Sequence, residues 1–296
     1  MHLWNQSAIG RWLRAAMVLA AVWMPTTNHV WADEGQVSFA VNDDASSLPA
    51  LLLESHSEAF PLPQFQQYMS ETRPIAISAL PYTIMQSGKY YLDSDLELTD
   101  RAALGAAITV MADDVDLDLG DHSITVSPTI AAIFIHYASN VSVYNGRLVT
   151  PTVSNDANSV GILTHHVAHA VFDNIVFLNT MRGAYTQTSQ DLTFINCRFT
   201  HPYAEIWGGA VGIAAGHGTQ GLSVEACLFD LIGSCGILLH SNEMGAAAET
   251  TLAQIRNCQF RDMGSAIYLA SRKDALPISN VEISDCEFNY IDCTVG

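Results

Sequence analysis

Residues 194–199 read FINCRF, and similar stretches follow at 224–229 (VEACLF), 255–260 (IRNCQF) and 283–288 (ISDCEF). Two more divergent copies are residues 172–177 (FDNIVF) and 143–148 (VYNGRL). Each copy places a turn residue between two apolar positions. A short Ile-x-aliphatic segment precedes each copy, and these segments open at Ile108, Ile133, Ile162, Ala184, Ile213, Ile237 and Ile267.

The spacing of these openings gives a repeat of roughly 22 to 30 residues. Each unit holds only short strands with period-2 alternation, and no part of it has the apolar period of a helix. A unit of this size cannot bury its apolar side chains alone, so successive copies must stack on one another. The repeat therefore predicts an all-β, parallel solenoid.

The chain resembles the right-handed parallel β-helix superfamily, which has the pectin-lyase-like fold. The resemblance covers about residues 75–296 and rests on the repeat, the Asn-Cys turn column and the segment from Ile108 to Gly120. It implies a right-handed β-helix of about seven to eight rungs, with an N-terminal cap at 75–105 and rungs at 106–296. A further copy begins where the sequence stops, so we expect the rungs either to continue or to be covered by another chain.

Residues 1–32 have the pattern of a secretory signal peptide, in which Arg11 and Arg14 precede a short apolar run and a small-residue cleavage site. The apolar run is too short to span a bilayer, although an uncleaved anchor is the alternative. We expect residues 33–74 to be a loosely ordered leader with one short helix near 64–70. The protein is therefore expected to be secreted, or to reside in the periplasm or cell envelope.

The mature chain is strongly acidic. The full sequence carries a formal net charge of −18 at pH 7, and loss of Arg11 and Arg14 takes this to −20, because no acid precedes Asp33. Such a charge disfavours nucleic acid and anionic membrane surfaces, so we expect no nucleic-acid partner and no membrane insertion after cleavage. An anionic glycan would need a local basic cluster or Ca²⁺. The sequence does not indicate an oligomeric state.

Four of the six cysteines occupy one repeat position. Cys197, Cys227, Cys258 and Cys286 are spaced by 30, 31 and 28 residues. Stacking places their Cα atoms about 4.8 Å apart, within reach of a disulfide, but parallel Cβ directions are poor geometry for closing the bond. We therefore predict a buried column of free thiols. The alternative in an exported chain is a disulfide framework.

Alignment of the first strands produces an outward column rich in histidine. It contains Met111, His136, His165, Gln187, Gly216 (or His217 after one inserted residue), His240 and Ala270. The outward residues two positions earlier are Thr109, Phe134, Leu163, Tyr185, Ala214, Leu238 and Tyr268. Imidazoles and aromatic rings suit sugar recognition, and histidine can act as a base. The alternative is that these side chains only stack from rung to rung and satisfy the turns.

The family resemblance implies polysaccharide lyases, glycoside hydrolases, epimerases, phage tailspikes or adhesin-like stalks. We interpret the protein as an exported β-helix that binds or processes polysaccharide, lyase- or hydrolase-like if it is an enzyme. The catalytic candidates are His165, Arg182 and His240. The substrate-binding candidates are Tyr185, Gln187, Tyr203, Trp207, His217 and Tyr268. The alternative is a non-catalytic surface or envelope scaffold, which the apolar outward residues favour.

Other chemistry fits the sequence less well, and no cofactor or metal is expected. His165, His166 and His169 fan to different sides of a strand-to-turn segment, without a carboxylate at ligand spacing. The motif Gly216-His217-Gly218 matches polygalacturonases, but no carboxylate pair lies one rung upstream, as a glycosidase requires. A calcium site remains the alternative reading of the acids Asp113, Asp114, Asp116, Asp118 and Asp121, which alternate with core residues as solvent-exposed charges do.

Overall fold

The computed structural model describes residues 30–32, 35–37, 73–99, 105–151, 159–201, 210–216, 218–241, 251–271 and 278–291. The chain divides into two compact units, residues 1–62 and 63–296. In the first unit, the described strands β1 (Val30–Ala32) and β2 (Gly35–Val37) pair antiparallel. The leader helix expected near 64–70 and most of the expected signal peptide lie outside the described residues.

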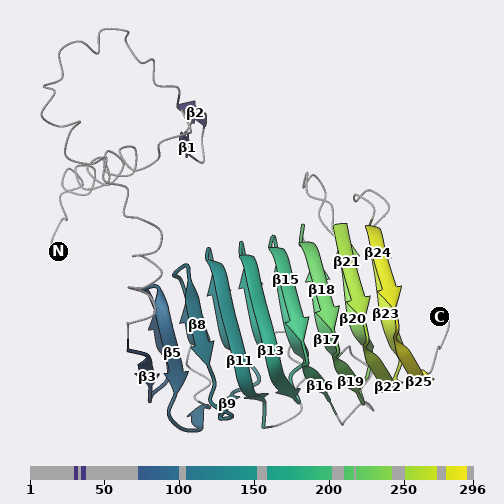
Figure 1. The fold of residues 1–296 in the computed structure, drawn as a ribbon, viewed down its shortest axis with the longest axis horizontal. Helices are drawn as coiled ribbons and strands as arrows, with labels where there is room; N and C mark the ends of the chain where they lie inside the picture. Colours follow the sequence, from purple (N-terminus) through teal and green to yellow (C-terminus); the bar gives the residue numbers. More distant parts are fainter. Residues whose placement is uncertain are drawn as a thin grey trace, which may run out of the picture. The chain divides into compact units, whose positions relative to one another are not determined.

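The second unit is a stack of parallel strands in three rows. In Figure 1 the strands of successive rungs lie side by side. Row one is a sheet of eight strands: β4 (Tyr82–Ile84), β7 (Ala106–Val110), β10 (Ala131–His136), β12 (Val160–His165), β14 (Arg182–Gln187), β17 (Val211–Gly216), β20 (Cys235–Ser241) and β23 (Ser265–Ser271). A rung is one turn of the solenoid, with one strand in each row. Row one positions the candidate site.

Rows two and three share two long, bent strands, β11 (Ser139–Val149) and β13 (Ala168–Leu178). The other strands of row two are β3 (Ile75–Ile77), β5 (Gly88–Leu92), β8 (Val115–Asp118), β15 (Gln190–Ile195), β18 (Gln220–Glu225), β21 (Thr251–Arg256) and β24 (Ser279–Ser284). Those of row three are β6 (Leu96–Leu98), β9 (Ser123–Val126), β16 (Arg198–Thr200), β19 (Leu228–Asp230), β22 (Gln259–Met263) and β25 (Glu287–Ile291).

The register of row one is the one that the repeat predicts. Each opening residue pairs with the next, from Ile108 through to Ile267. In the outward column, His165 pairs with Gln187, and Gly216 occupies the position beside it, so the inserted-residue alternative is wrong. The all-β, parallel solenoid inferred from the sequence is confirmed.

The core of row three is a stack of phenylalanine rings. Phe177, Phe199, Phe229, Phe260 and Phe288 follow one another with centroids 4.5, 4.7, 4.9 and 5.2 Å apart and planes within 6° of parallel. Glycine at the second position of the facing row-one strands leaves room for them. A Cβ on Gly161 or Gly212 would lie 2.6 Å from the Cδ1 atom of Phe177 or Phe229, a separation that forces the packing apart.

The bend between rows two and three uses left-handed backbone. Asn145, Asn174, Asn196 and Asn257 have φ between 52 and 57°, a conformation that asparagine tolerates better than most residues. The cysteine column follows directly, and its four thiols are free. The Cys197 thiol donates to the Ile195 carbonyl at 3.3 Å, and its equivalents repeat this bond on the next rungs. The predicted thiol column is confirmed.

The two ends of the solenoid differ. Residues 75–98 supply β3 to β6, which continue all three rows in parallel. On the last rung, the inward-facing residues Leu269, Ile283 and Phe288 are about half exposed.

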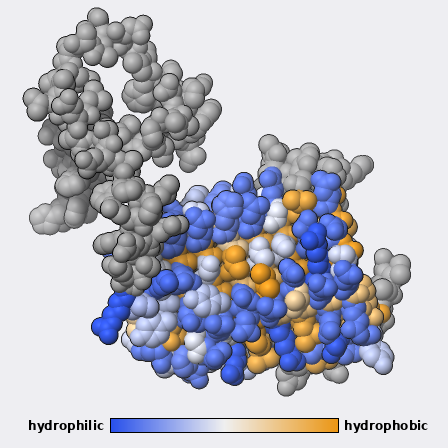
Figure 2. All heavy atoms as spheres, in the orientation of Figure 1, coloured by the Kyte–Doolittle hydropathy of each residue, from blue (hydrophilic) through white to orange (hydrophobic). Residues whose placement is uncertain are grey.

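Figure 2, with row two towards the viewer, shows hydrophilic residues bordering an apolar area. Within the described ranges, the protein has no helix with the length and hydropathy needed to cross a membrane.

Candidate functional site

The outward side of row one carries two apolar clusters that meet at β14. The first consists of Ala106, Ala131 and Val160, packed with Phe134, Leu163 and Tyr185. The second consists of Val211, Ala214 and Cys235, packed with Tyr185 and Leu238. Tyr185 packs against both clusters, so the two clusters meet at β14.

Three side chains of β14 form a polar centre there. The guanidinium carbon of Arg182 lies 4.5 Å from the centroid of the Tyr185 ring. The Gln187 amide donates to the Tyr185 hydroxyl at 2.8 Å. All three side chains are half-buried and point outward, because Gly183 and Ala184 both face the core and reset the alternation of the strand. A cation, a phenol and an amide therefore share one surface point.

His240 reaches the same centre from two rungs away. Its ring lies 6.4 Å from the Tyr185 ring, with planes 15° apart, and the residue is 7% exposed. In the register, Gly216 stands between Gln187 and His240. A Cβ on Gly216 would collide with the His240 ring, so glycine at this position opens the space that the imidazole fills. The structure thus brings together four predicted residues: Arg182, Tyr185, Gln187 and His240.

A buried hydroxyl network lies beneath this centre, and sequence reasoning missed it. Thr164 contacts Ser189 at 3.1 Å, and Thr186 contacts Thr219 at 3.1 Å, all four residues being at most 1% exposed. Ser189 and Thr219 each donate at 2.8 Å to the carbonyl that ends a strand, those of Gln187 and Gly216. The network fixes the ends of β14 and β17. The signal in the sequence was threonine at positions 164 and 186 of an inward column that the other rungs fill with Ile, Val, Leu or Ala.

The candidate His165 lies in a different cluster. In the register it neighbours Gln187, but its ring stacks on His136 with centroids 5.1 Å apart. His166 lies 4.2 Å from His165, and Tyr137 stacks on His166 at 4.6 Å. Burial and the neighbouring imidazoles lower the pKa of His165. His165 and His240 are three rungs apart, roughly 14 Å at the usual strand spacing, so they do not form one acid–base pair.

The sequence of most of the solenoid matches a known protein family. Residues 131–295 match the family described as "Right handed beta helix region", which is more than half of the sequence. The chain belongs to this right-handed β-helix family. No curated protein matches it.

Several solved structures resemble this β-helix at low identity. They include an alginate lyase from Paenibacillus, with 12% identity, a TM-score of 0.47, and coverage of 76% of this chain and 94% of that one. A pectate lyase variant from Xanthomonas campestris has 11% identity, a TM-score of 0.39, and coverage of 74% and 81%. A surface protein and adhesin of Streptococcus pneumoniae has 9% identity, a TM-score of 0.32, and coverage of 74% and 88%. Function has to be argued from the chain's own residues.

The other candidates lie apart from the centre or outside the described ranges. Tyr268 pairs in register with Leu238 and is 55% exposed, so its ring is available to solvent one rung beyond His240. Tyr203, Trp207 and His217 are outside the residues that the structure describes. Their assignment as substrate-binding residues stays a prediction.

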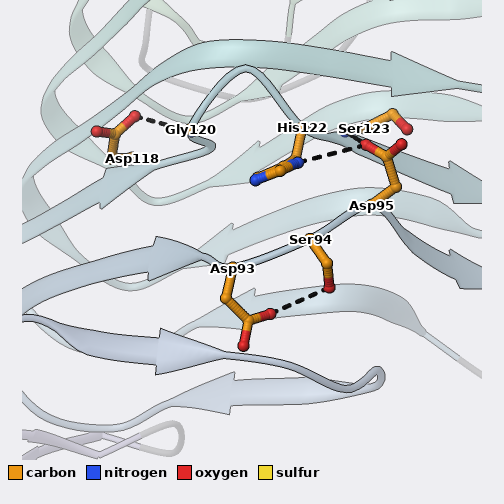
Figure 3. A network of polar contacts seen from close by, with 7 residues as sticks. All are labelled: Asp93, Ser94, Asp95, Asp118, Gly120, His122 and Ser123. Atoms are coloured by element: carbon orange, nitrogen blue, oxygen red, sulfur yellow. Dashed lines mark hydrogen bonds and ion pairs between the residues drawn. The ribbon is translucent and has the colours of Figure 1, made fainter.

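The acids of the first rungs act as turn caps in this β-helix (Figure 3). Asp95 accepts from the backbone N–H of Ser123 at 2.7 Å, which lowers the pKa of Asp95, and it lies 3.6 Å from His122. Asp118 accepts from the backbone N–H of Gly120 at 2.9 Å. Asp113 caps Ser139 one rung on at 2.7 Å. Each of these three carboxylates has a backbone partner, and no metal-binding cluster of His, Cys, Asp or Glu occurs among the described residues.

The composition of row one limits the chemistry of the site. None of the described row-one strands contains Asp or Glu. Hydrolysis of a glycosidic bond usually employs two carboxylates that flank it, and the described strands of row one do not supply them. It does supply a guanidinium, imidazoles and a phenol. These groups suit recognition of an acidic sugar and proton transfer near neutral pH.

Proposed function

We propose that the protein binds an acidic polysaccharide along the outer side of row one, centred on β14. The observation that carries this proposal is the position of Arg182 on the outer surface, with its guanidinium over the Tyr185 ring. No ion pair joins it to a carboxylate in the described part of the chain. By contrast, Arg198 lies 3.3 Å from Asp230 and Arg256 lies 3.1 Å from Glu282. An arginine left without a counter-charge in so acidic a chain is suited to an anionic ligand.

The surroundings of Arg182 suit a uronate ring. A guanidinium binds a carboxylate through two parallel hydrogen bonds, and the Tyr185 ring behind it holds its plane. The Tyr185 hydroxyl and the Gln187 amide offer hydrogen bonds for sugar hydroxyls. Successive rungs stand about 4.8 Å apart, so an extended chain of sugars can follow the row and meet equivalent positions in turn.

If the polysaccharide is processed, the residues favour β-elimination over hydrolysis. Arg182 would neutralise the uronate carboxylate, and His240 would take the C5 proton as base. The C4–O bond then breaks, a C4–C5 double bond forms, and the departing oxygen gains a proton, which the Tyr185 hydroxyl would donate. His165, one rung from Gln187, is a second candidate base on the other side of β14. Export, inferred from residues 1–32, would bring the protein to such a polymer.

A second function is favoured by the apolar clusters beside the polar centre. Small and branched apolar residues fill the outward positions before and after β14. A surface or envelope scaffold would use such a face for protein contact rather than for sugars. Under this reading, Arg182 and Tyr185 are only part of the surface between the two apolar clusters, and no polysaccharide binds.

The test is binding of polygalacturonate and alginate to the wild-type protein, with neutral dextran as the uncharged control. We expect Arg182→Gln to lower the affinity at least about tenfold, since a charged hydrogen bond contributes about 1.5–3 kcal/mol. Arg198→Gln, an arginine of row three that already has a carboxylate partner, is the matched control and should bind as wild type does. Absence of wild-type binding, or equal binding by both variants, would reject the proposal and favour the scaffold.

Elimination is tested in the same preparations. Cleavage of a polyuronate by this route creates an unsaturated product that absorbs in the ultraviolet. Loss of that signal in His240→Ala, with retained binding, would support His240 as the base. A hydrolytic product without the double bond would contradict the β-elimination route.

A further inference from the structure

Five aromatic side chains at the C-terminal ends of β10 and β12 and in the turns that follow form a second cluster of rings. Phe134 stacks on His136 with centroids 5.1 Å apart, and His136 stacks on His165 at the same separation. At the turn beside them, Tyr137 stacks on His166 at 4.6 Å with planes 12° apart. His165 and His166 meet edge to face at 4.2 Å. Three imidazoles therefore occupy one patch of β10, β12 and their turns.

The mode of stacking determines what the patch can bind. His136 stacks on Phe134 of its own strand and on His165 of the next rung, and Tyr137 stacks on His166, so the rings cover one another's faces at these contacts. The ring edges, which carry the imidazole nitrogens, are what an external ligand meets. Tyr137 is 64% exposed and His166 is also exposed, so the patch is open to solvent along its outer edge. The imidazole nitrogens can act through hydrogen bonds and, once protonated, through charge.

The groups around the patch are nearly all uncharged. The rung before it contributes Met111 in the same column, and the rung after it contributes Gln187 and Thr188. Two acids lie in the turn of the rung before it: Asp113 accepts from the backbone N–H and hydroxyl of Ser139 at 2.7 and 2.8 Å, and Asp114 accepts from the Asn140 amide at 3.0 Å. Further along the turn, His169 lies 3.3 Å from Asp191 and has its own counter-charge. Protonation of the three imidazoles would therefore create positive charge without a protein partner.

We propose that His136, His165 and His166 form a proton-dependent anion subsite, which takes carboxylate groups of the polysaccharide once the imidazoles are charged. The identity of the anion as an acidic polysaccharide rests on the proposed function; the anion subsite itself does not. The subsite extends the proposed polysaccharide-binding surface of row one from β14 to β10, and it makes the affinity for the polymer depend on pH.

The direction of the response follows from linkage. Burial, together with the adjacent rings of His166 and His136, lowers the pKa of His165, since each positive charge disfavours the next. A bound carboxylate supplies the missing counter-charge and favours the protonated form. Protons and anion must then strengthen each other's binding equally. Affinity for the anion rises as the pH falls through the range in which the imidazoles titrate.

The experiment measures affinity at about pH 7.5 and about pH 5, on either side of the ordinary histidine pKa. The probes are polygalacturonate and dextran sulfate, with neutral dextran as control. We expect wild type to bind both polyanions about tenfold more tightly at the lower pH. Changing His136, His165 and His166 together to Gln should abolish that gain. His122→Gln, which alters a histidine in the turn before β9 beside Asp95, is the control and should keep it.

Two arms separate this inference from the proposed function. Arg182→Gln should lower polyuronate binding at both pH values yet retain the gain on acidification. If Arg182→Gln has no effect but the triple variant loses the gain for dextran sulfate, the anion subsite stands and the β14 site does not. If the triple variant keeps the gain, the subsite is rejected. Should the triple variant fail to fold by circular dichroism, His166→Gln alone, an exposed position, replaces it and should at least halve the gain.

Discussion

The inside and the outside of the solenoid follow different rules along the same strands. Inside, one residue type recurs, as in the phenylalanine stack from Phe177 to Phe288. Outside, the column from Met111 to Ala270 changes at almost every rung. An interior residue must pack on its copies above and below, so the stack constrains its type. An outward residue has no such constraint, and its variation is where ligand chemistry is built.

The largest expected effect comes from breaking an interior column. Phe229 is fully buried between Phe199 and Phe260. We expect Phe229→Ala to lower the free energy of unfolding by about 3–5 kcal/mol, because it removes contacts on both ring faces and leaves a cavity. Ile195→Ala, at a half-buried outward position of row two, should cost about 1 kcal/mol or less. Equal losses in denaturant unfolding would show that the stack does not dominate stability.

This contrast also explains how much could be predicted from the sequence. The openings from Ile108 to Ile267 and the cysteine column were predictable, because stacking repeats them at a constant position. Strand alternation also identified Tyr185 and His240 as outward. It could not show that Gly216 lets the His240 ring approach Tyr185, nor that His165 turns towards His136. Those arrangements depend on rotamers and on contacts between rungs, which no repeat pattern encodes.

The next effect is a loss of stability in acid from a buried imidazole. His201 is 6% exposed, neither ring nitrogen has a hydrogen-bond partner among the described residues, and burial lowers its pKa. With a folded-state pKa below the unfolded value of about 6.5, His201 gives full stability above that value. As the pH falls from there towards the lower folded pKa, unfolding should become easier by at most about 1.4 kcal/mol per pH unit.

The measurement is urea unfolding across this pH range. His201→Phe keeps an aromatic ring without a titrating group, so its stability should fall less steeply with acid than that of wild type. Thr180 and His201 line one small cavity. Thr180→Val alters this cavity without removing a titrating group, so it should keep the wild-type slope. An unchanged slope in His201→Phe would remove His201 as the cause.

A smaller effect tests the hydroxyl network beneath β14. Thr219→Val keeps the shape but deletes the hydroxyl that contacts Thr186 and donates to the Gly216 carbonyl. We expect a loss of about 1 kcal/mol in the free energy of unfolding, and weaker polyuronate binding because the strand ends are less well fixed. Thr125→Val, at a half-buried position of row three, should change neither. A stability loss without any change in binding would separate the network from the site.

The smallest effect is expected from the acids of the first rungs. Asp118 accepts from the Gly120 N–H at 2.9 Å and lies 3.4 Å from the Asn145 amide nitrogen. Asn at position 118 retains a carbonyl oxygen that can accept the first of these bonds, so Asp118→Asn should change the free energy of unfolding by no more than about 0.5 kcal/mol. Added Ca²⁺ should stabilise wild type and Asp118→Asn equally little, since these acids serve as turn caps. A marked stabilisation of wild type by Ca²⁺ that is lost in Asp118→Asn would instead identify a metal site on this rung, and with it a second way for an acidic solenoid to hold an anionic polymer.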